Sequence, residues 1–133
     1  MTLMLNVDWR SLPNAPAAGT PLCALGELAP GEIREFSFPG DSGATPLFRL
    51  IVYRDGDQVN AYVNQCPHHW LPMNRSDGVF LRWSHTELMC SHHSAVFNLA
   101  GNGECIMGPC QGSNLTRVPL QVSEGQIRIR TGD

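Results

Sequence analysis

The chain has 133 residues, of which 42% are hydrophobic and 16% charged, a composition typical of one globular domain and unlike that of a disordered or fibrous protein. Nine arginines stand against twelve acidic residues and lysine is absent, so the net charge is -3 and a nucleic-acid or anionic-membrane surface is disfavoured. The sequence has no basic segment leading into an apolar one and no apolar run of roughly 18 residues. We therefore expect neither a signal peptide nor a membrane span, and a cytoplasmic location.

Short strands are the elements that the chain favours, because 13 glycines and 10 prolines divide it at close intervals. Residues 1–19 are expected to form an irregular arm. After it, apolar segments predict strands at residues 22–25, 33–38, 47–53, 59–63, 80–82, 88–89, 95–97, 104–107, 118–122 and 127–130. Asp55-Gly56, Asn102-Gly103 and Glu124-Gly125 predict tight turns, the first with two positive φ angles. No window has a 3.6-residue apolar stripe, so the prediction is an antiparallel all-β fold.

Two segments, residues 64–72 and 90–94, fit neither a strand nor a simple turn. All five histidines of the chain lie between positions 68 and 93. Within the two segments, Cys66-x-His68 and Cys90-x-x-His93 each offer one thiolate and one imidazole. Since each segment follows a predicted strand or hairpin, we expect two loops at one end of a sheet to present four metal ligands.

Four such ligands admit two kinds of centre. They could hold one zinc ion tetrahedrally, or a two-iron cluster with thiolates on one iron and imidazoles on the other. Structural zinc sites usually begin with a pair of cysteines or end with a pair of histidines. Here each half mixes the two ligand types, which favours a cluster whose two irons differ.

The motif resembles that of the Rieske [2Fe–2S] family, whose ligation is of this mixed type. The resemblance implies that Cys66, His68, Cys90 and His93 bind the cluster. The spacer between the two motifs, residues 69–89, is somewhat long for the family, and an extended hairpin around Trp83 is expected to accommodate it. The resemblance also implies stacked antiparallel sheets in a single domain, residues 1–133, with a small cluster-binding subdomain, about residues 64–111, inserted in a base domain.

Neighbouring positions indicate which kind of Rieske centre the chain resembles. High-potential members carry an extra disulfide-bonded cysteine in each ligand loop, but the matching positions here are Leu71 and His92. Those members also donate hydrogen bonds to the cluster from a serine and a tyrosine, where this chain has Ala95 and Phe97. Donors to the sulfurs raise the potential, so a value near the lower end of the Rieske range, roughly −150 mV, is expected.

The resemblance implies a soluble one-electron carrier that works between a flavin-dependent reductase and a terminal oxygenase or other oxidoreductase. One alternative is a small or regulatory subunit of a larger reductase, such as a nitrite reductase; another is a zinc-stabilised structural domain. The chain has no Gly-x-Gly-x-x-Gly motif for a nucleotide cofactor and too few further histidines for a mononuclear iron site. It is therefore expected to serve an oxidoreductase system without a substrate site of its own.

The remaining cysteines, histidines and tryptophans have simpler interpretations. His69 and His92 adjoin ligands and are expected to face solvent or to lie behind the ligands, and His85 to be exposed in a turn. Two tryptophans, Trp9 and Trp83, are expected to cover or enter the core. Three cysteines are expected to be small buried apolar residues and not disulfide partners, namely Cys23, Cys105 and Cys110.

Overall fold

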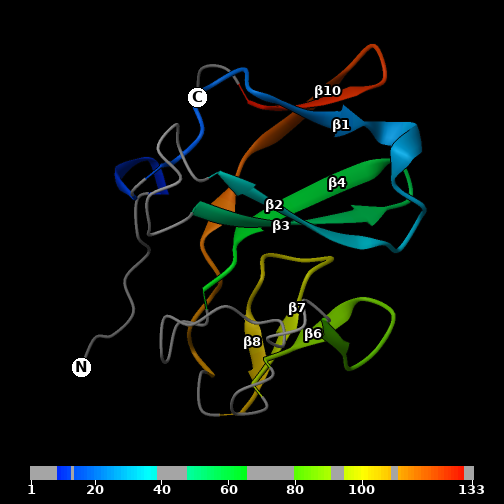
Figure 1. Ribbon diagram of the computed structural model, residues 1–133. Coiled ribbons are helices and arrows are strands. Elements are labelled where there is room, and N and C mark those ends of the chain that lie inside the picture. Colours follow the sequence, from blue (N-terminus) through cyan, green and yellow to red (C-terminus); the bar gives the residue numbers. More distant parts are fainter. Residues whose placement is uncertain are drawn as a thin grey trace.

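The computed structural model describes residues 9–12, 14–38, 48–65, 80–90, 95–108 and 111–130. In these ranges the chain forms eleven strands and two single 3₁₀ turns, η1 (Trp9–Ser11) and η2 (Leu25–Glu27). The strands make three antiparallel sheets that lie one above another (Figure 1). The expected all-β, stacked antiparallel fold is confirmed. Neither helix of this part of the chain is long or apolar enough to cross a membrane.

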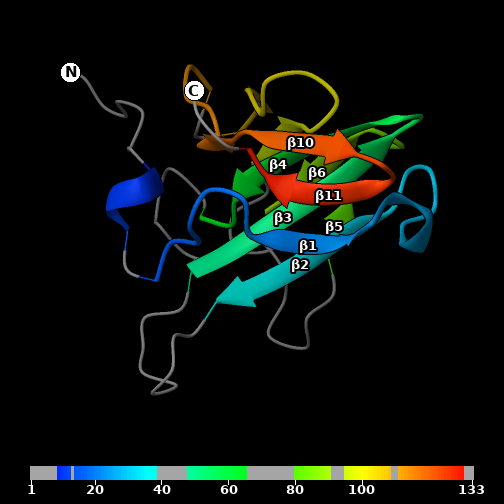
Figure 2. The same cartoon turned by 90° about the horizontal axis from the view of Figure 1, so that it is seen from above.

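An upper sheet, a middle sheet and, below them, a small sheet of short strands differ in strand order. The upper sheet has the order β1 (Pro21–Ala24), β11 (Gln126–Ile129), β10 (Leu120–Ser123). The middle sheet has the order β2 (Ile33–Phe38), β3 (Phe48–Asp55), β4 (Gln58–Val63), β9 (Arg117–Val118). The small sheet has the order β5 (Leu81–Arg82), β6 (Glu87–Met89), β7 (Val96–Asn98), β8 (Cys105–Met107). Figure 2 shows the upper sheet lying across the middle one.

The middle sheet is buried on both faces and therefore contributes to two cores. Leu50 and Val52 of β3 pack in a cluster with Ile127 and Ile129 of the upper sheet. The alternate residues of β3 pack in a second cluster, together with Tyr62 of β4 and residues of the small sheet. A strand buried on both sides has an almost continuous apolar sequence, and β3 reads Phe-Arg-Leu-Ile-Val-Tyr.

Part of the predicted arm packs against the upper and middle sheets. The η1 turn buries Trp9, whose ring meets that of Phe48 edge-on at a centroid distance of 6.2 Å. Arg10 lies over the face of the same indole, 4.8 Å from its centroid. Aromatic edge-to-face pairs and cation–π contacts both favour this docking. The arm thus adds to the core that lies between the upper and middle sheets.

One predicted strand, residues 118–122, is wrong as a single element. Arg117 and Val118 belong to β9 in the middle sheet, whereas Leu120 onward forms β10 in the upper sheet. Pro119 separates the two, and it has no N–H to donate to a ladder. The proline therefore marks the point where the chain passes from one sheet to the next.

The β3–β4 turn differs by one residue from its prediction. Asp55 pairs with Gln58 as the last rung of the ladder, so the two turn residues are Gly56 and Asp57. Gly56 has φ +61° and Asp57 is not in the positive-φ region, the pattern of a turn with glycine first. At the β10–β11 turn, Glu124 and Gly125 have positive φ angles of 54° and 75°, as such two-residue turns require.

Candidate metal centre

The second ligand motif begins where β6 ends. The N–H of Cys90 donates to the carbonyl of Ala95 at 2.7 Å, which continues the β6–β7 ladder by one step. The chain therefore leaves the small sheet at Cys90 and rejoins it at Ala95. This one short hydrogen bond joins the two ends of the segment that contains the motif. His93 lies between them, outside the described residues.

The Cys90 side chain is almost completely buried, with 1% of its surface exposed. It belongs to an apolar cluster that includes Leu88, Ala95 and Phe97 of the same hairpin and Tyr62 of the middle sheet. A thiolate needs a metal to be stable in such surroundings, because burial disfavours its charge. The residue thus fits the sulfur side of a Rieske-type cluster, where an iron is shielded from solvent.

The first ligand motif follows β4 of the middle sheet. Asn64, immediately after the strand, is buried, and its N–H donates to the carbonyl of Arg49 at 2.8 Å. The Asn64 side chain donates to a carboxylate oxygen of Glu35 at 2.7 Å, and the same oxygen accepts from Arg49 Nε at 2.6 Å. The chain is held as far as Gln65, whose N–H donates to the Val63 carbonyl at 2.9 Å. Cys66 and His68 come next and lie outside the described residues.

The spacer between the two motifs ends in the expected hairpin. Strands β5 and β6 pair around residues 83–86, and the Trp83 N–H donates to the Glu87 carbonyl at 2.9 Å. The hairpin is attached to the middle sheet through the carbonyl of His85, which accepts from the Tyr53 hydroxyl at 3.4 Å and from Arg82 at 2.8 Å. The described end of the spacer, residues 80–89, thus contributes the first two strands of the small sheet.

The segment that follows β8 contains Gly108, Pro109 and Cys110, and the resemblance to the Rieske family implies a third, proline-containing loop beside the centre here. The Cys105 thiol is buried and donates to the carbonyl of Met107 at 3.2 Å. Beyond the loop, the Gln111 side chain donates back to the Ile106 carbonyl at 3.1 Å. Cys105 is also joined through its N–H to the Ser113 carbonyl at 2.9 Å. Pro109 and Cys110, which the sequence places in this loop, lie outside the described residues.

Of the four predicted ligands, the described part of the chain includes Cys90 alone. Accordingly, no three His, Cys, Asp or Glu side chains within that part come together as a metal site. The two positions compared with hydroxyl donors, Ala95 and Phe97, are fully buried beside Cys90 in the same cluster and carry no hydroxyl. Leu71, His69 and His92 lie outside the described residues.

The other simple predictions have mixed outcomes. His85 is exposed and Trp9 is buried, as expected. Cys105 is buried, but Cys23 is only half-buried; partial burial nevertheless raises the pKa of the Cys23 thiol. Trp83 is 53% exposed, so the expectation that it covers or enters the core is wrong. It lies between β5 and β6, at the bend of the hairpin.

A polar network that the sequence analysis missed joins the small sheet to the middle sheet. The carbonyl of Leu99 accepts from Tyr62 Oη at 2.8 Å and from Asn60 Nδ2 at 2.9 Å. Arg117 of β9 donates to Asn60 Oδ1 at 2.8 Å and to the Gly101 carbonyl at 3.1 Å. Burial raises the pKa of Tyr62 to about 12, so its hydroxyl stays a donor at every physiological pH. Asn60 and Tyr62 stand two residues apart in β4 and therefore lie on one face of the strand. This spacing was the feature of the sequence that could have indicated the network.

Comparison with known proteins identifies the family. The model of the Rieske [2Fe-2S] domain matches residues 19–125, which is most of the chain. No curated protein sequence gives a significant match.

Several solved structures resemble the chain. One is the ferredoxin of carbazole 1,9a-dioxygenase from Nocardioides aromaticivorans IC177, with a TM-score of 0.65 and 21% identity over 87% of this chain and 100% of that one. Another comes from a complex of reduced oxygenase and oxidized ferredoxin in carbazole 1,9a-dioxygenase, with a TM-score of 0.63 and 27% identity over 83% of this chain and 90% of that one.

The terminal oxygenase of carbazole 1,9a-dioxygenase from Novosphingobium sp. KA1 also matches, with a TM-score of 0.68 and 17% identity. That match covers 87% of this chain but 30% of the oxygenase chain, so the likeness is to one part of a larger protein. The solved structures thus agree with the fold described above. The family model covers both ligand motifs. The chain therefore belongs to the Rieske [2Fe-2S] domain family, whose cofactor is a Rieske-type [2Fe–2S] cluster.

Proposed function

We propose that the chain is a one-electron carrier, a Rieske-type ferredoxin, in which Cys66, His68, Cys90 and His93 hold the cluster. The observation that carries this proposal is the burial of Cys90 directly after β6, within a chain that belongs to the Rieske family. When bound, the cluster accepts and gives up a single electron. We also propose that residues 1–133 form a single domain, of which about residues 64–111 form the cluster-binding part.

The protein's own residues supply the surroundings of the cluster. Cys90 would bind the inner iron through its thiolate, in an apolar environment from which water is excluded by Ala95 and Phe97. Cys66 would provide the second thiolate, and His68 and His93 the imidazoles. Because Ala95 and Phe97 have no hydroxyl to donate to the cluster sulfurs, the potential should lie low in the Rieske range.

The partners that we propose are a flavin-dependent reductase as electron donor and a terminal oxygenase as acceptor. Support comes from the matched structures: one is the ferredoxin of an oxygenase system, and another contains an oxygenase together with its ferredoxin. We propose that the chain acts as the carrier between such partners, and that it does so in the cytoplasm.

The sequence supports the same choice. Besides the proposed ligands His68 and His93, the chain has three histidines, His69, His85 and His92, and two of these adjoin ligands. A mononuclear iron of the two-histidine, one-carboxylate kind needs histidines and a carboxylate in one place, away from the cluster. We therefore propose that the chain passes electrons on and leaves the reaction with substrate to another protein.

Metal and sulfide analysis of the purified protein tests this function. We expect about two irons and two acid-labile sulfides per chain, with visible absorption that bleaches on reduction by dithionite and returns in air. Cys66→Ser and His93→Ala should lose that absorption, whereas His69→Ala should keep it. A colourless protein that contains zinc would contradict the proposal, as would a His69→Ala variant without its cluster. Voltammetry should give a potential well below about +100 mV, given a Rieske range of about −150 to +300 mV.

A further inference from the structure

A polar trio, Glu35, Arg49 and Asn64, lies where the chain leaves the middle sheet for the first ligand motif. Arg49 donates to Glu35 from two nitrogens, Nε at 2.6 Å and Nη2 at 3.0 Å, which makes a two-pronged ion pair. Asn64 Nδ2 adds a third donor at 2.7 Å, to the carboxylate oxygen that Arg49 Nε also reaches. Three neighbouring segments, β2, β3 and the residue after β4, thus meet at one carboxylate.

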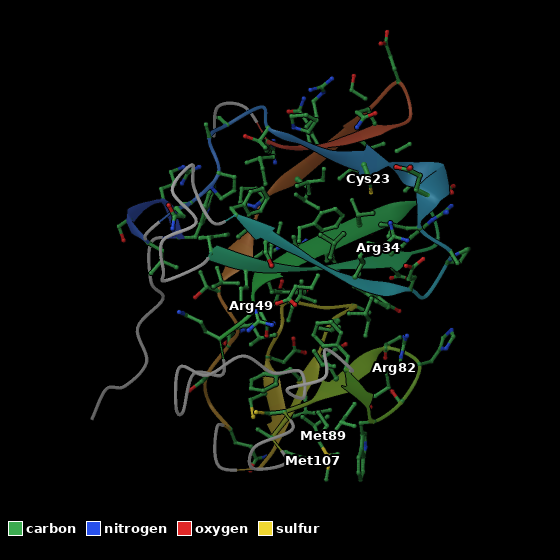
Figure 3. The ribbon with its side chains drawn as sticks, in the orientation of Figure 1. Cys23, Arg34, Arg49, Arg82, Met89 and Met107 are labelled. Carbon is green, nitrogen blue, oxygen red and sulfur yellow. The ribbon has the colours of Figure 1, made fainter. Side chains whose placement is uncertain are left out.

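The trio lies on the face of the middle sheet that is turned toward the small sheet. Glu35 pairs with Ile51 across the β2–β3 ladder, and Ile51 pairs with Tyr62 across the β3–β4 ladder, so these side chains share one face. Ile51 and Tyr62 belong to the core cluster that contains Cys90. Figure 3 shows Arg49 on this side of the sheet, between it and the strands below.

Stability alone does not explain a charged group at this place. Side-chain exposure is 18% for Glu35 and 30% for Arg49, and Asn64 as a whole is 1% exposed. The desolvation cost of the carboxylate and the guanidinium is roughly equal to the free energy of their attraction. A pair of apolar side chains would pack at this place without any desolvation cost. A two-pronged pair of an arginine and a carboxylate does, however, fix the relative orientation of the two side chains, which apolar contacts do not.

Asn64 is the member of the trio that links this fixed geometry to the first ligand motif. It is tied to β3 through its main chain, by the N–H bond to the Arg49 carbonyl at 2.8 Å, and to β2 through its side chain. Cys66 is two residues further on. We infer that Glu35, Arg49 and Asn64 are positioning residues that set the angle at which the chain enters the first ligand motif, and thereby the geometry of the Cys66 sulfur. This inference rests on the proposed ligand role of Cys66.

Asn64→Ala is the variant that isolates the effect. It removes the side-chain bond to Glu35 but leaves the main-chain bond and the Glu35–Arg49 pair in place. We expect the variant to fold and to bind iron, but to release the cluster to a chelator about tenfold faster than the wild-type protein. The g values of the reduced cluster in electron paramagnetic resonance should also shift. Glu35→Gln, which cannot satisfy all three donors, should have both effects.

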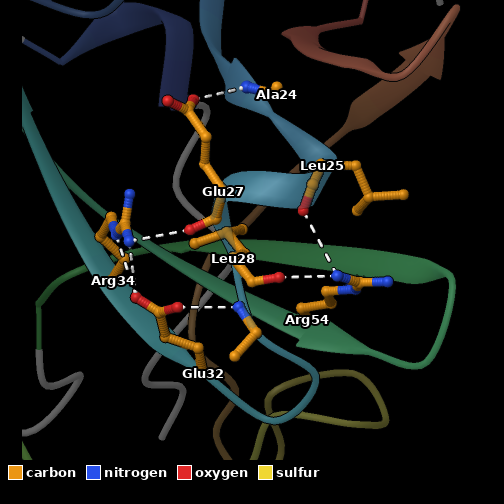
Figure 4. A network of polar contacts seen from close by, with 8 residues as sticks. Ala24, Leu25, Glu27, Leu28, Glu32, Arg34 and Arg54 are labelled. Carbon is orange, nitrogen blue, oxygen red and sulfur yellow. Dashed lines mark hydrogen bonds and ion pairs between the residues drawn. The ribbon is translucent and has the colours of Figure 1, made fainter.

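The chain offers a matched control in Glu32 and Arg34, a second two-pronged pair close by at the start of β2. Arg34 donates to Glu32 from Nε at 3.0 Å and from Nη2 at 2.8 Å, and the other carboxylate oxygen accepts from the Ala29 N–H at 2.8 Å (Figure 4). Arg34 also donates to the Glu27 carbonyl at 3.0 Å, so this pair secures the segment between η2 and β2. Glu32→Gln should therefore lower the free energy of unfolding without changing the release rate or the g values.

The outcomes separate this inference from the proposed function. Wild-type protein without iron and labile sulfide would overturn the proposed function itself. If the wild type holds a cluster and Asn64→Ala and Glu35→Gln match it in release rate and g values, the positioning role is overturned; it is overturned equally if Glu32→Gln changes them as much. Should Asn64→Ala fail to fold, Arg49→Lys replaces it with the same expected result, because lysine keeps the charge and loses the two-pronged geometry.

Discussion

Gly103 lies at the turn between β7 and β8, where the main chain passes over the ring of Tyr62. Its φ is +72°, a region that side chains other than glycine rarely occupy. A Cβ atom at this position would also come within 2.7 Å of Tyr62 Cε1 and 3.1 Å of Leu115 Cβ. The Asn-Gly pair that predicted a turn from the sequence therefore has a second role, which is to let the turn approach the middle sheet closely.

We expect Gly103→Ala to destabilise the protein by about 3 kcal/mol, since backbone strain and overpacking add together. Gly56→Ala is the control, because Gly56 has a positive φ of +61° but no atom within 4 Å of the place that a Cβ would take. Strain alone should therefore cost Gly56→Ala about 1 to 2 kcal/mol. Urea denaturation of both variants measures the difference. Equal losses of stability would show that the approach to Tyr62 is not tight.

At the scale of the element, the β7–β8 hairpin is closed by the carboxylate of Glu104. Glu104 Oε1 accepts from the Asn102 N–H at 2.9 Å, and Oε2 accepts from Asn98 Nδ2 at 3.1 Å. Hydrogen bonds from its own N–H and from that of Asn102 hold the pKa of Glu104 below its ordinary value of 4.5. The hairpin thus carries a charged residue that favours the folded state.

This lowered pKa makes the stability of the hairpin depend on pH. The ionised form contributes stability in full above pH 4.5, and that contribution is lost as the pH falls through the lower, folded-state pKa. Wild-type protein should therefore be more stable than Glu104→Gln at pH 7, and the difference should shrink as the pH falls below 4.5. Denaturation of both proteins at each pH measures it. The exposed Glu124→Gln controls for the loss of one charge, and a difference that persists at low pH would contradict the assignment.

Across the whole molecule, the small sheet is attached to the middle sheet by an apolar core and by a few hydrogen bonds. The carbonyl of Leu99 is central to them because it accepts from both Tyr62 and Asn60, two residues of β4. Leu99 and Tyr62 are also fully buried in the shared core. The attachment bears on the proposed centre, since Cys66 comes three residues after β4 of the middle sheet and Cys90 comes directly after β6 of the small one.

Removing either donor alone should be tolerated, because the Leu99 carbonyl keeps the other. We expect Tyr62→Phe and Asn60→Ala each to cost about 1 kcal/mol, and the double variant to cost more than their sum, since the buried carbonyl then loses both donors. A double-mutant cycle from denaturant unfolding measures the coupling. Strictly additive losses would mean that the two bonds act independently.

Local features of the sequence predicted most strands and the approximate positions of the turns, and they suggested the four candidate ligands. Alternating apolar residues and Gly-containing pairs act within a few residues, and the types of metal ligand follow from side-chain chemistry alone. The roles of Asn60 and Tyr62 in β4 were not predicted from the sequence, because they depend on the small sheet that packs against this strand. The ligand roles of Cys66, His68, Cys90 and His93 remain predictions; of the four, the structure describes Cys90, and that residue is buried.

Only the tertiary structure decided which strands pair and how the two ligand segments are held. β1 pairs with β11, from the other end of the chain, and Pro119 divides one predicted strand between two sheets. The contacts of Glu35 with Asn64, and of Tyr62 with Leu99, join residues about 30 or more positions apart. Such pairings depend on the packing of whole sheets, and no local pattern of the sequence specifies them.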